Sequence, residues 1–260
     1  MAKQAKNTES AKNPESEWFG YRKVDAGEKT RLVEDVFSSV ATRYDLMNDL
    51  MSGGLHRLWK RKFLSIVYPR PEHHLLDLAG GTGDIAFRYL EKTNRSARVT
   101  VCDLSAEMLA VGRDRAIDRG ILKDIDWVEG NAEKLPFADN SFDTCTIAFG
   151  LRNVTHIDTA LKEIHRVLKP GGRFFCLEFS HVVLPVLDKL YDAYSFHVIP
   201  KLGEWVAKDA GSYQYLAESI RKFPTQDNLK QRMTDAGFSQ TRYRNMSGGI
   251  VAIHSGLKGI

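Results

Sequence analysis

The sequence predicts an α/β fold built on a parallel sheet, and three observations support this prediction. Five short apolar runs, each compatible with a strand, follow one another between residues 75 and 179. Stretches with the apolar spacing of helices separate them, which is the order produced when helices connect parallel strands. A glycine-rich loop, Gly80-Gly81-Thr82-Gly83, follows the first run directly, at the edge where such sheets bind ligands.

The N-terminal part is expected to contain a tail and then helices. Residues 1–29 are rich in Lys, Asn, Ser and Glu and poor in apolar side chains, which predicts a disordered tail. Residues 30–260 are expected to form a single domain. It should begin with N-terminal helices over residues 30–70, because apolar residues recur at helical spacing as far as Val67 and Pro69 then ends the pattern.

The next part of the domain should carry the five parallel strands. They are expected at residues 75–78, 99–103, 125–128, 142–149 and 173–179. Ser105 suits the N-cap of a helix that reaches about residue 119, and a second helix is expected over residues 157–168. Lys169-Pro170-Gly171-Gly172 has the composition of a turn and precedes the fifth strand.

The C-terminal part departs from this alternation. Residues 181–222 are rich in aromatic and aliphatic side chains at helical spacing, which predicts a helical insertion over the carboxyl ends of the strands. A helix over residues 225–236 should follow. Residues 242–246 and 249–254, joined at Ser247-Gly248, are expected to close the sheet as a hairpin, which brings it to seven strands.

Composition excludes several classes of protein. With 260 residues and a formal net charge of +4, the chain is only mildly basic, which is not typical of a dedicated nucleic-acid binder. No apolar run is long enough to span a membrane, and the N-terminus lacks the features of a targeting segment. Cys102, Cys145 and Cys176 lie in apolar runs without metal-site or disulfide spacing. A cytoplasmic protein without a metal site is expected.

The glycine loop alone leaves two cofactors open. Gly81-x-Gly83-x-x-Ala86, with Asp103 about 20 residues further on, matches the fingerprint of a nicotinamide dinucleotide site. Glycine is expected there because the backbone must turn sharply and approach a ligand without a Cβ in the way. S-adenosylmethionine would suit the same loop, because Asp103 can bind ribose hydroxyls and no pyrophosphate has to be neutralised. Asp77 and Asp84 could then hold its amino group.

The loops that follow favour S-adenosylmethionine. Asn131-Ala132 comes after the third strand, where a small residue beside a polar one can contact an adenine edge. Asp139-Asn140-Ser141 and residues 166–172 lead into the fourth and fifth strands. As an ordered set over residues 75–180, these motifs resemble the class I S-adenosylmethionine-dependent methyltransferases. The resemblance implies a seven-stranded, Rossmann-like sheet and a cofactor that approaches the backbone of Gly80, Gly81 and Gly83.

Two longer runs narrow the family. Residues 44–59, which begin Tyr44-Asp45-Leu46-Met47-Asn48, and residues 166–180 resemble signatures of the C-methyltransferases of ubiquinone and menaquinone biosynthesis. The resemblance covers about residues 30–258. It implies methyl transfer from S-adenosylmethionine to a ring carbon of a polyprenylated quinol, which is 2-methoxy-6-polyprenyl-1,4-benzoquinol, demethylmenaquinol or both. It also implies cofactor contacts by Thr82, Asp103, Asn131 and Ala132. Ala148 stands where the family often has a serine.

Five residues are candidates for a catalytic role. Arg152 and Asn153 follow the fourth strand, where the substrate would lie, and a guanidinium there could stabilise a quinolate and assist its deprotonation through water. A capping or ion-paired arginine is the alternative for Arg152. His197 is a candidate base, although a lone histidine on an apolar face is more often structural. Tyr44 and Asp45 could reach the same pocket from the N-terminal helices, or could serve helix packing.

The expected partners follow from the substrate. A polyprenyl tail needs an apolar site, which the stripe from Leu184 to Trp205 could form, and Lys189, Lys201 and Lys208 favour contact with the inner face of an anionic membrane. Assembly with other proteins of quinone biosynthesis is also compatible with the sequence. The alternatives are a methyltransferase for another small molecule, a nicotinamide-dependent oxidoreductase, a nucleic-acid methyltransferase and a scaffold without activity.

Overall fold

The computed structural model describes residues 16–41, 48–49, 52–183 and 210–260. The N-terminal part contains β1 (Ser16–Phe19), β2 (Arg22–Asp25), α1 (Ala26–Val40) and α3 (His56–Val67). The alternating part contains β3 (His74–Leu78), α4 (Asp84–Lys92), β4 (Arg98–Asp103), α5 (Ala106–Asp118), β5 (Ile125–Glu129), β6 (Phe142–Ala148), the 3₁₀ helix η2 (Leu151–Asn153), α6 (Ile157–Val167) and β7 (Leu168–Phe179). The C-terminal part contains α9 (Ala210–Lys222), α10 (Gln226–Asp235), β8 (Phe238–Met246), the 3₁₀ helix η4 (Ser247–Gly249) and β9 (Val251–Lys258). The helices α1 and α3 correspond to the predicted N-terminal helices.

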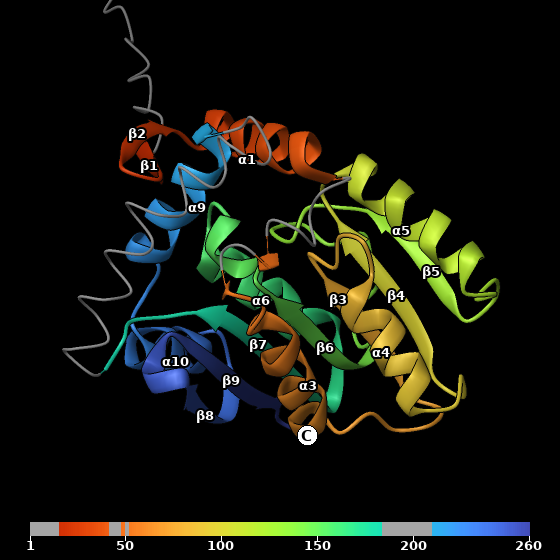
Figure 1. The fold of residues 1–260 in the computed structure, drawn as a ribbon. Coiled ribbons are helices and arrows are strands. Elements are labelled where there is room, and N and C mark those ends of the chain that lie inside the picture. Colours follow the sequence, from red (N-terminus) through yellow and green to blue (C-terminus); the bar gives the residue numbers. More distant parts are fainter. Residues whose placement is uncertain (1–15, 42–47, 50–51, 184–209) are drawn as a thin grey trace, which may run out of the picture.

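The described strands from β3 onward form a seven-stranded sheet in the order β5-β4-β3-β6-β7-β9-β8 (Figure 1). The first five of these strands are parallel, whereas β9 runs antiparallel to both β7 and β8. This confirms the predicted fold class, a parallel sheet closed by a C-terminal hairpin. The chain builds outward from β3 to β4 and β5 and then returns to the other side of β3 with β6 and β7. The strand order therefore reverses beside β3, and α/β sheets bind ligands at the carboxyl ends of the strands at such a point.

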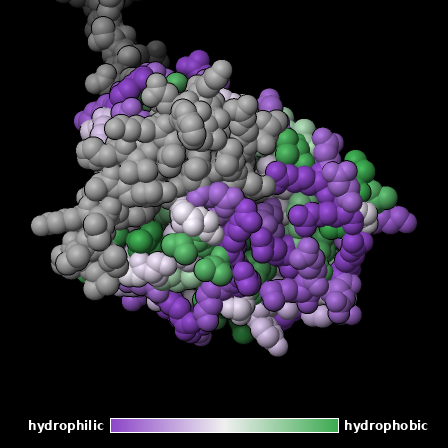
Figure 2. Space-filling view, viewed as in Figure 1, coloured by the Kyte–Doolittle hydropathy of each residue, from purple (hydrophilic) through white to green (hydrophobic). Residues whose placement is uncertain are grey.

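Alternate residues of the strands point to opposite faces of the sheet and pack under different helices. Leu75, Val99 and Val101 belong to an apolar cluster with residues of α3, α4 and α5. Leu76 and Leu78, which are out of phase with Leu75 by one position, belong to a second cluster with residues of α6 and α10. The side-chain period of two along a strand produces this division. The outer surface on the right of Figure 2, where Figure 1 places α4 and α5, is mostly hydrophilic.

The predicted N-terminal tail, residues 1–29, needs correction in its last part. The strands β1 and β2 form an antiparallel hairpin, and α1 begins at Ala26. The ring of Phe19 stacks on the ring of Tyr215 in α9, with 4.1 Å between their centroids. Local composition cannot reveal this hairpin, because the surface that stabilises it comes from the far end of the chain. Residues 1–15 lie outside the described residues.

Other differences concern the ends of elements. The strand β7 begins at Leu168, so it includes residues 169–172, which were predicted as a turn. At these residues the register of β7 with β6 shifts. The closing hairpin is longer than predicted, since β8 begins at Phe238 and β9 ends at Lys258. In the predicted insertion over residues 181–222, α9 is helical as expected, and residues 184–209 lie outside the described part of the chain.

Candidate functional site

A pocket lies at the carboxyl ends of β3, β4, β5 and β6, and α1 forms one of its walls. The walls of this main pocket come from α1 (Thr30, Val33, Glu34, Phe37), the end of β3 and its loop (Leu78, Ala79, Gly81), the end of β4 and the start of α5 (Asp103, Leu104, Ser105, Met108), the loop after β5 (Gly130, Asn131, Ala132, Glu133) and the loop after β6 (Phe149, Gly150, Asn153, Val154, Thr155). The pocket therefore brings together five of the predicted site residues: Gly81, Asp103, Asn131, Ala132 and Asn153. The N-terminal helices were expected to reach the pocket through Tyr44 and Asp45, and the described residues that they contribute are those of α1.

The glycine loop has the predicted sharp conformation, but packing also demands its glycines. Gly81 and Gly83 have φ angles of +51° and +81°, which favour glycine. A Cβ on Gly83 would lie 2.7 Å from the ring of Trp127, and a Cβ on Gly80 would lie 2.8 Å from the carbonyl oxygen of Asp77. Glycine is therefore needed at positions 80 and 83 because the protein packs against itself there, whether or not a ligand approaches.

Asp103 ends β4 with its carboxylate held at the wall of the main pocket. Oδ2 accepts a hydrogen bond from the backbone N–H of Gly81 (2.8 Å), and Oδ1 accepts one from the N–H of Ser105 (3.0 Å). Burial raises the pKa of Asp103, while these N–H donors favour the charged form and oppose the rise. A carboxylate fixed in this way keeps lone pairs that can accept hydrogen bonds from ribose hydroxyls. The geometry is compatible with the predicted role.

The loop after β5 presents one small side chain and one bracing carboxylate. The side-chain oxygen of Asn131 accepts a hydrogen bond from the N–H of Glu133 (2.8 Å) and fixes the turn beside Ala132. Oε1 of Glu133 accepts the N–H groups of Thr155 (3.1 Å) and His156 (3.0 Å), and Oε2 lies 2.6 Å from Nδ1 of His156. Glu133 therefore ties together two walls of the main pocket. No sequence pattern predicts this bridge, because its partners are distant along the chain.

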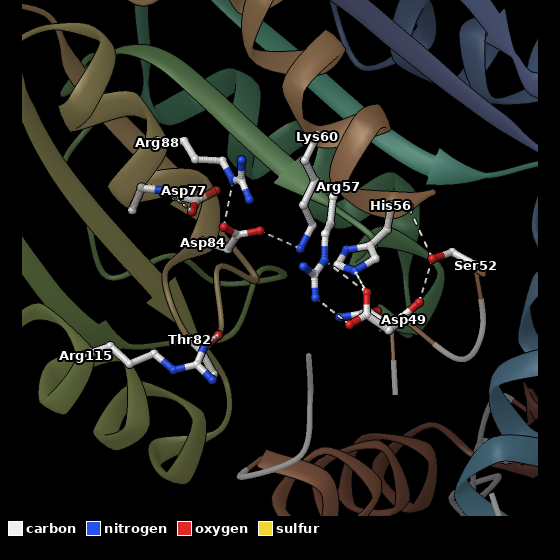
Figure 3. A network of polar contacts seen from close by, with 12 residues as sticks. Asp49, Ser52, His56, Arg57, Lys60, Asp77, Thr82, Asp84, Arg88 and Arg115 are labelled. Carbon is white, nitrogen blue, oxygen red and sulfur yellow. Dashed lines mark hydrogen bonds and ion pairs between the residues drawn. The ribbon is translucent and has the colours of Figure 1, made fainter. Parts of the chain in front are cut away.

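Thr82 lies apart from the main pocket. The residue is buried, and its hydroxyl accepts a hydrogen bond of 3.0 Å from Nη1 of Arg115 (Figure 3). Together with Gly80, it lines a second, smaller pocket beside the glycine loop. Any contact between Thr82 and a ligand would therefore belong to the second pocket rather than to the one that holds Asp103.

The second pocket lies between the glycine loop, the start of α4 and the helix α3 (Figure 3). Its lining consists of Lys60, Asp77, Ala79, Gly80, Thr82, Asp84, Ile85 and Ala148. Asp84 lies 2.9 Å from Nζ of Lys60 and 2.7 Å from Nε of Arg88. Burial alone would raise the pKa of Asp84, but the two cations outweigh it and lower the pKa to about 2. Burial raises the pKa of Asp77, at the base of the loop, to about 7.

Arg152 forms an ion pair with a buried carboxylate. Nη1 of Arg152 lies 2.7 Å from Oε1 of Glu178, and it also donates a hydrogen bond to the carbonyl oxygen of Phe149 (2.6 Å). The two charged side chains are only 3% and 1% exposed. Arg152 is not among the described residues that line the main pocket. The structure therefore supports the ion-paired alternative for Arg152 rather than direct contact with a quinolate. Glu178 was not predicted, because it occurs within an otherwise apolar strand.

Asn153, by contrast, lines the main pocket and is anchored by α9. Its Oδ1 accepts a hydrogen bond from the hydroxyl of Tyr215 at 3.1 Å. Burial raises the pKa of Tyr215, which keeps this hydroxyl protonated as a donor. On the opposite side of the loop, the hydroxyls of Thr30 and Thr155 lie 3.2 Å apart. The loop after β6 is thus held between α1 and α9.

The remaining catalytic candidates, Tyr44, Asp45 and His197, lie outside the described residues. In the part of the chain that the structure describes, no group of three or more His, Cys, Asp or Glu side chains could hold a metal ion. Across the same residues, no helix is long and apolar enough to cross a membrane.

Known proteins with similar sequences identify the family. The family model described as the ubiE/COQ5 methyltransferase family matches residues 23–258. The ubiquinone/menaquinone biosynthesis C-methyltransferase UbiE of Brucella abortus (strain S19) is 58% identical over 242 residues, which cover 92% of this chain and 90% of that protein. The protein of the same name from Brucella anthropi is 57% identical, and the match covers 92% of each chain. The chain belongs to the ubiE/COQ5 methyltransferase family.

Solved structures are similar to this ubiE/COQ5 family member in fold. A SAM dependent methyltransferase from Aquifex aeolicus aligns with a TM-score of 0.58 at 14% identity, over 90% of this chain and 98% of that one. Phosphoethanolamine N-methyltransferase 2 of Haemonchus contortus, solved in complex with S-adenosyl-L-methionine, aligns with a TM-score of 0.58 at 17% identity, over 78% of this chain and 52% of that one. Membership of a methyltransferase family also decides against the nicotinamide-dependent oxidoreductase that the glycine loop alone left open.

Proposed function

We propose that this chain is an S-adenosylmethionine-dependent C-methyltransferase of ubiquinone or menaquinone biosynthesis, which methylates a ring carbon of a polyprenylated benzoquinol or naphthoquinol. The observation that carries the proposal is the 58% identity, over 92% of the chain, to the ubiquinone/menaquinone biosynthesis C-methyltransferase UbiE of Brucella abortus. The position of the main pocket, at the carboxyl ends of four parallel strands, supports it.

The residues of the main pocket fit the adenosine part of S-adenosylmethionine. Hydrogen bonds from two backbone N–H groups hold the carboxylate of Asp103 in place, and its oxygens would accept hydrogen bonds from the ribose hydroxyls. Leu104 and Met108 on one side and Ala132 on another supply the apolar surface that an adenine ring needs. Phe37 of α1 belongs to the same lining and would help to exclude water.

The chain must then position a ring carbon of the quinol and accept its protons. S-adenosylmethionine supplies a methyl group activated by a positively charged sulfur. A quinol carbon becomes nucleophilic when the neighbouring hydroxyl loses its proton, and alignment of the two reacting carbons supplies much of the rate. Glu133 and Tyr215 hold the loop after β6, so that Asn153 has a fixed position at the pocket. We keep His197 as a candidate for the base, and Tyr44 and Asp45 as candidates for a catalytic role in the same pocket.

A methyl-transfer assay tests this function. The protein is incubated with S-adenosylmethionine that carries a labelled methyl group and with a demethylated benzoquinol or naphthoquinol. We expect the label to appear on the ring of at least one acceptor, and the preferred acceptor identifies the pathway. Folded protein that binds the cofactor but labels neither quinol would contradict the proposal.

We also propose that the protein contacts the membrane peripherally, where its polyprenylated substrate resides, and that it can associate with other proteins of quinone biosynthesis. The residues that suggest membrane contact, Lys189, Lys201 and Lys208, lie outside the described residues. Sedimentation with anionic vesicles tests the first point. A variant with these three lysines changed to glutamate should sediment less than the wild-type protein, and equal sedimentation would count against membrane contact.

A further inference from the structure

Glu133 is the residue through which the loop after β5 holds the loop after β6. Its Oε1 accepts the N–H groups of Thr155 (3.1 Å) and His156 (3.0 Å), and its Oε2 lies 2.6 Å from Nδ1 of His156. The side chain of Glu133 is 18% exposed, so water screens these contacts only in part. One carboxylate therefore uses both of its oxygens on the neighbouring loop.

These contacts also fix the start of α6, which its own sequence does not cap. His156 is the N-cap residue of α6, and its side chain makes no cap hydrogen bond. The helices α5 and α10 are capped locally, because the side chains of Ser105 and Thr225 accept the N–H of the residue three positions further on. At α6 the carboxylate comes from another loop instead, and it lies at the positive end of the helix. The position of this helix start therefore depends on Glu133.

The loop after β6 is held from two other sides as well. Nζ of Lys29 in α1 donates a hydrogen bond to the carbonyl oxygen of Val154 (3.2 Å). The hydroxyl of Tyr215 in α9 donates one to Oδ1 of Asn153 (3.1 Å). Neither α1 nor α9 carries a predicted cofactor contact. Glu133 differs from these partners because it follows directly on two residues that were predicted to contact the cofactor.

The loop after β5 is itself braced where it lines the main pocket. Oδ1 of Asn131 accepts the N–H of Glu133 at 2.8 Å. Asn131, Ala132 and Glu133 all line the pocket, and so do Asn153 and Thr155 from the loop after β6. A ligand that packs against Asn131 and Ala132 therefore restricts Glu133, and through it the loop that presents Asn153.

We propose that Glu133 is a positioning residue that couples the binding of the two substrates. Cofactor on the loop after β5 orders the loop after β6 through Glu133, and this raises the affinity for the quinol. The inference rests on the proposed function and adds to it a coupling between its two ligands. The first ligand to bind orders both loops, so the second loses less conformational entropy. The coupling is reciprocal, since the quinol must raise the affinity for the cofactor by the same factor.

Quinol binding with and without a cofactor analogue tests the coupling. S-adenosylhomocysteine has no methyl group to transfer, so binding can be measured without turnover. The probes are a demethylated naphthoquinol and a demethylated benzoquinol with short prenyl chains, titrated anaerobically by calorimetry. We expect saturating S-adenosylhomocysteine to raise the quinol affinity of the wild-type protein roughly tenfold. In Glu133→Ala the two quinol affinities should agree within about twofold, because the link between the loops is lost.

Two further variants separate positioning from a general effect on stability. Glu133→Gln keeps a side-chain oxygen that can accept the N–H groups of Thr155 and His156, so it should restore most of the wild-type ratio of affinities. Thr225→Ala removes the cap of α10, and Thr225 lines neither the main pocket nor the second pocket. It should leave the ratio unchanged. The ratio is decisive, because a residue that only stabilises the fold would lower both affinities alike.

Several outcomes would overturn the inference. If Glu133→Ala keeps the wild-type ratio, Glu133 serves only the start of α6. The inference is also wrong if Glu133→Gln loses the ratio as fully as Glu133→Ala, or if Thr225→Ala lowers it equally. If Glu133→Ala does not unfold cooperatively, Glu133→Asp takes its place, since its shorter side chain withdraws the carboxylate from the loop after β6. Wild-type protein that binds a quinol equally well with and without S-adenosylhomocysteine would refute this inference alone, whereas folded protein that binds neither quinol would contradict the proposed function.

Discussion

Asp103 serves the glycine loop and the expected ligand with the same carboxylate. It accepts the N–H of Gly81 at 2.8 Å, so its removal should free the loop as well as take away the acceptor for ribose hydroxyls. We expect Asp103→Ala to weaken cofactor binding roughly tenfold or more, with a smaller effect on turnover at saturating cofactor. Isothermal titration and steady-state kinetics measure the two effects. Asp118→Ala, at the exposed end of α5, is the control, and equal binding by both variants would contradict the role of Asp103.

Arg152 and Glu178 couple the loop after β6 to β7 through a buried ion pair. In Arg152→Met, the carboxylate of Glu178 stays buried at 1% exposure without its cation. We expect the free energy of unfolding to fall by about 3–5 kcal/mol, as measured by urea denaturation. Because Arg152 does not line the main pocket, cofactor affinity in the folded variant should change little.

An exposed ion pair provides the control for Arg152→Met. Arg98 lies 2.9 Å from Asp126, with side chains that are 68% and 48% exposed. Solvent screens such a pair, so Arg98→Met should cost less than about 1 kcal/mol. If Arg152→Met lowers the free energy of unfolding by no more than Arg98→Met does, the buried ion pair does not stabilise the fold more than an exposed one.

The hairpin of β1 and β2 is joined to the main pocket through α9 and α1. The ring of Phe19 stacks on Tyr215, whose hydroxyl holds Asn153 at the pocket wall. We expect Phe19→Ser to loosen this wall and to weaken cofactor binding roughly three- to tenfold, in line with the contribution of one aromatic pair. Leu122→Ser, far from the hairpin, is the control, since Leu122 is 71% exposed. Equal affinities of the two variants would show that the hairpin is independent of the site.

The elements that the sequence predicts well are those with a local signal. The strands of the sheet appear in the sequence as short apolar runs. The glycine loop can be predicted because Gly81 and Gly83 have positive φ angles, which favour glycine over other residues. What the sequence does not contain is the partner of a residue. The position of Arg152 after the fourth strand is correct, yet Glu178 decides what its guanidinium does. Lys60 and Lys62 are alike in sequence, and only packing makes the first buried and the second exposed.

The stability of the whole molecule should depend on pH through two carboxyl groups whose pKa values are shifted in opposite directions by folding. The pKa of Asp84 is lowered from 3.8 to about 2, so its contribution is present above about pH 4 and is lost as the pH falls toward 2. The pKa of Asp77 is raised from 3.8 to about 7, so the folded state keeps a proton that the unfolded state has released. Its contribution is therefore fully present below about pH 4 and is lost as the pH rises through 7.

Asp77→Asn isolates the second of these effects. The amide cannot ionise, so the variant should lack the part of the pH dependence that Asp77 causes. We expect the free energy of unfolding of the wild-type protein, relative to the variant, to fall with rising pH between about 4 and 7, by at most ~1.4 kcal/mol per pH unit. The hydrogen bonds that Asp77 accepts from Thr146 (2.9 Å) and the N–H of Ala86 (3.2 Å) favour the carboxylate, and they keep the folded-state pKa from rising further. Urea denaturation at pH 4, 5, 6 and 7 measures it, with Asp118→Asn as the control. A difference between wild type and Asp77→Asn that stays constant over this range would mean that Asp77 is already charged in the folded protein at pH 4.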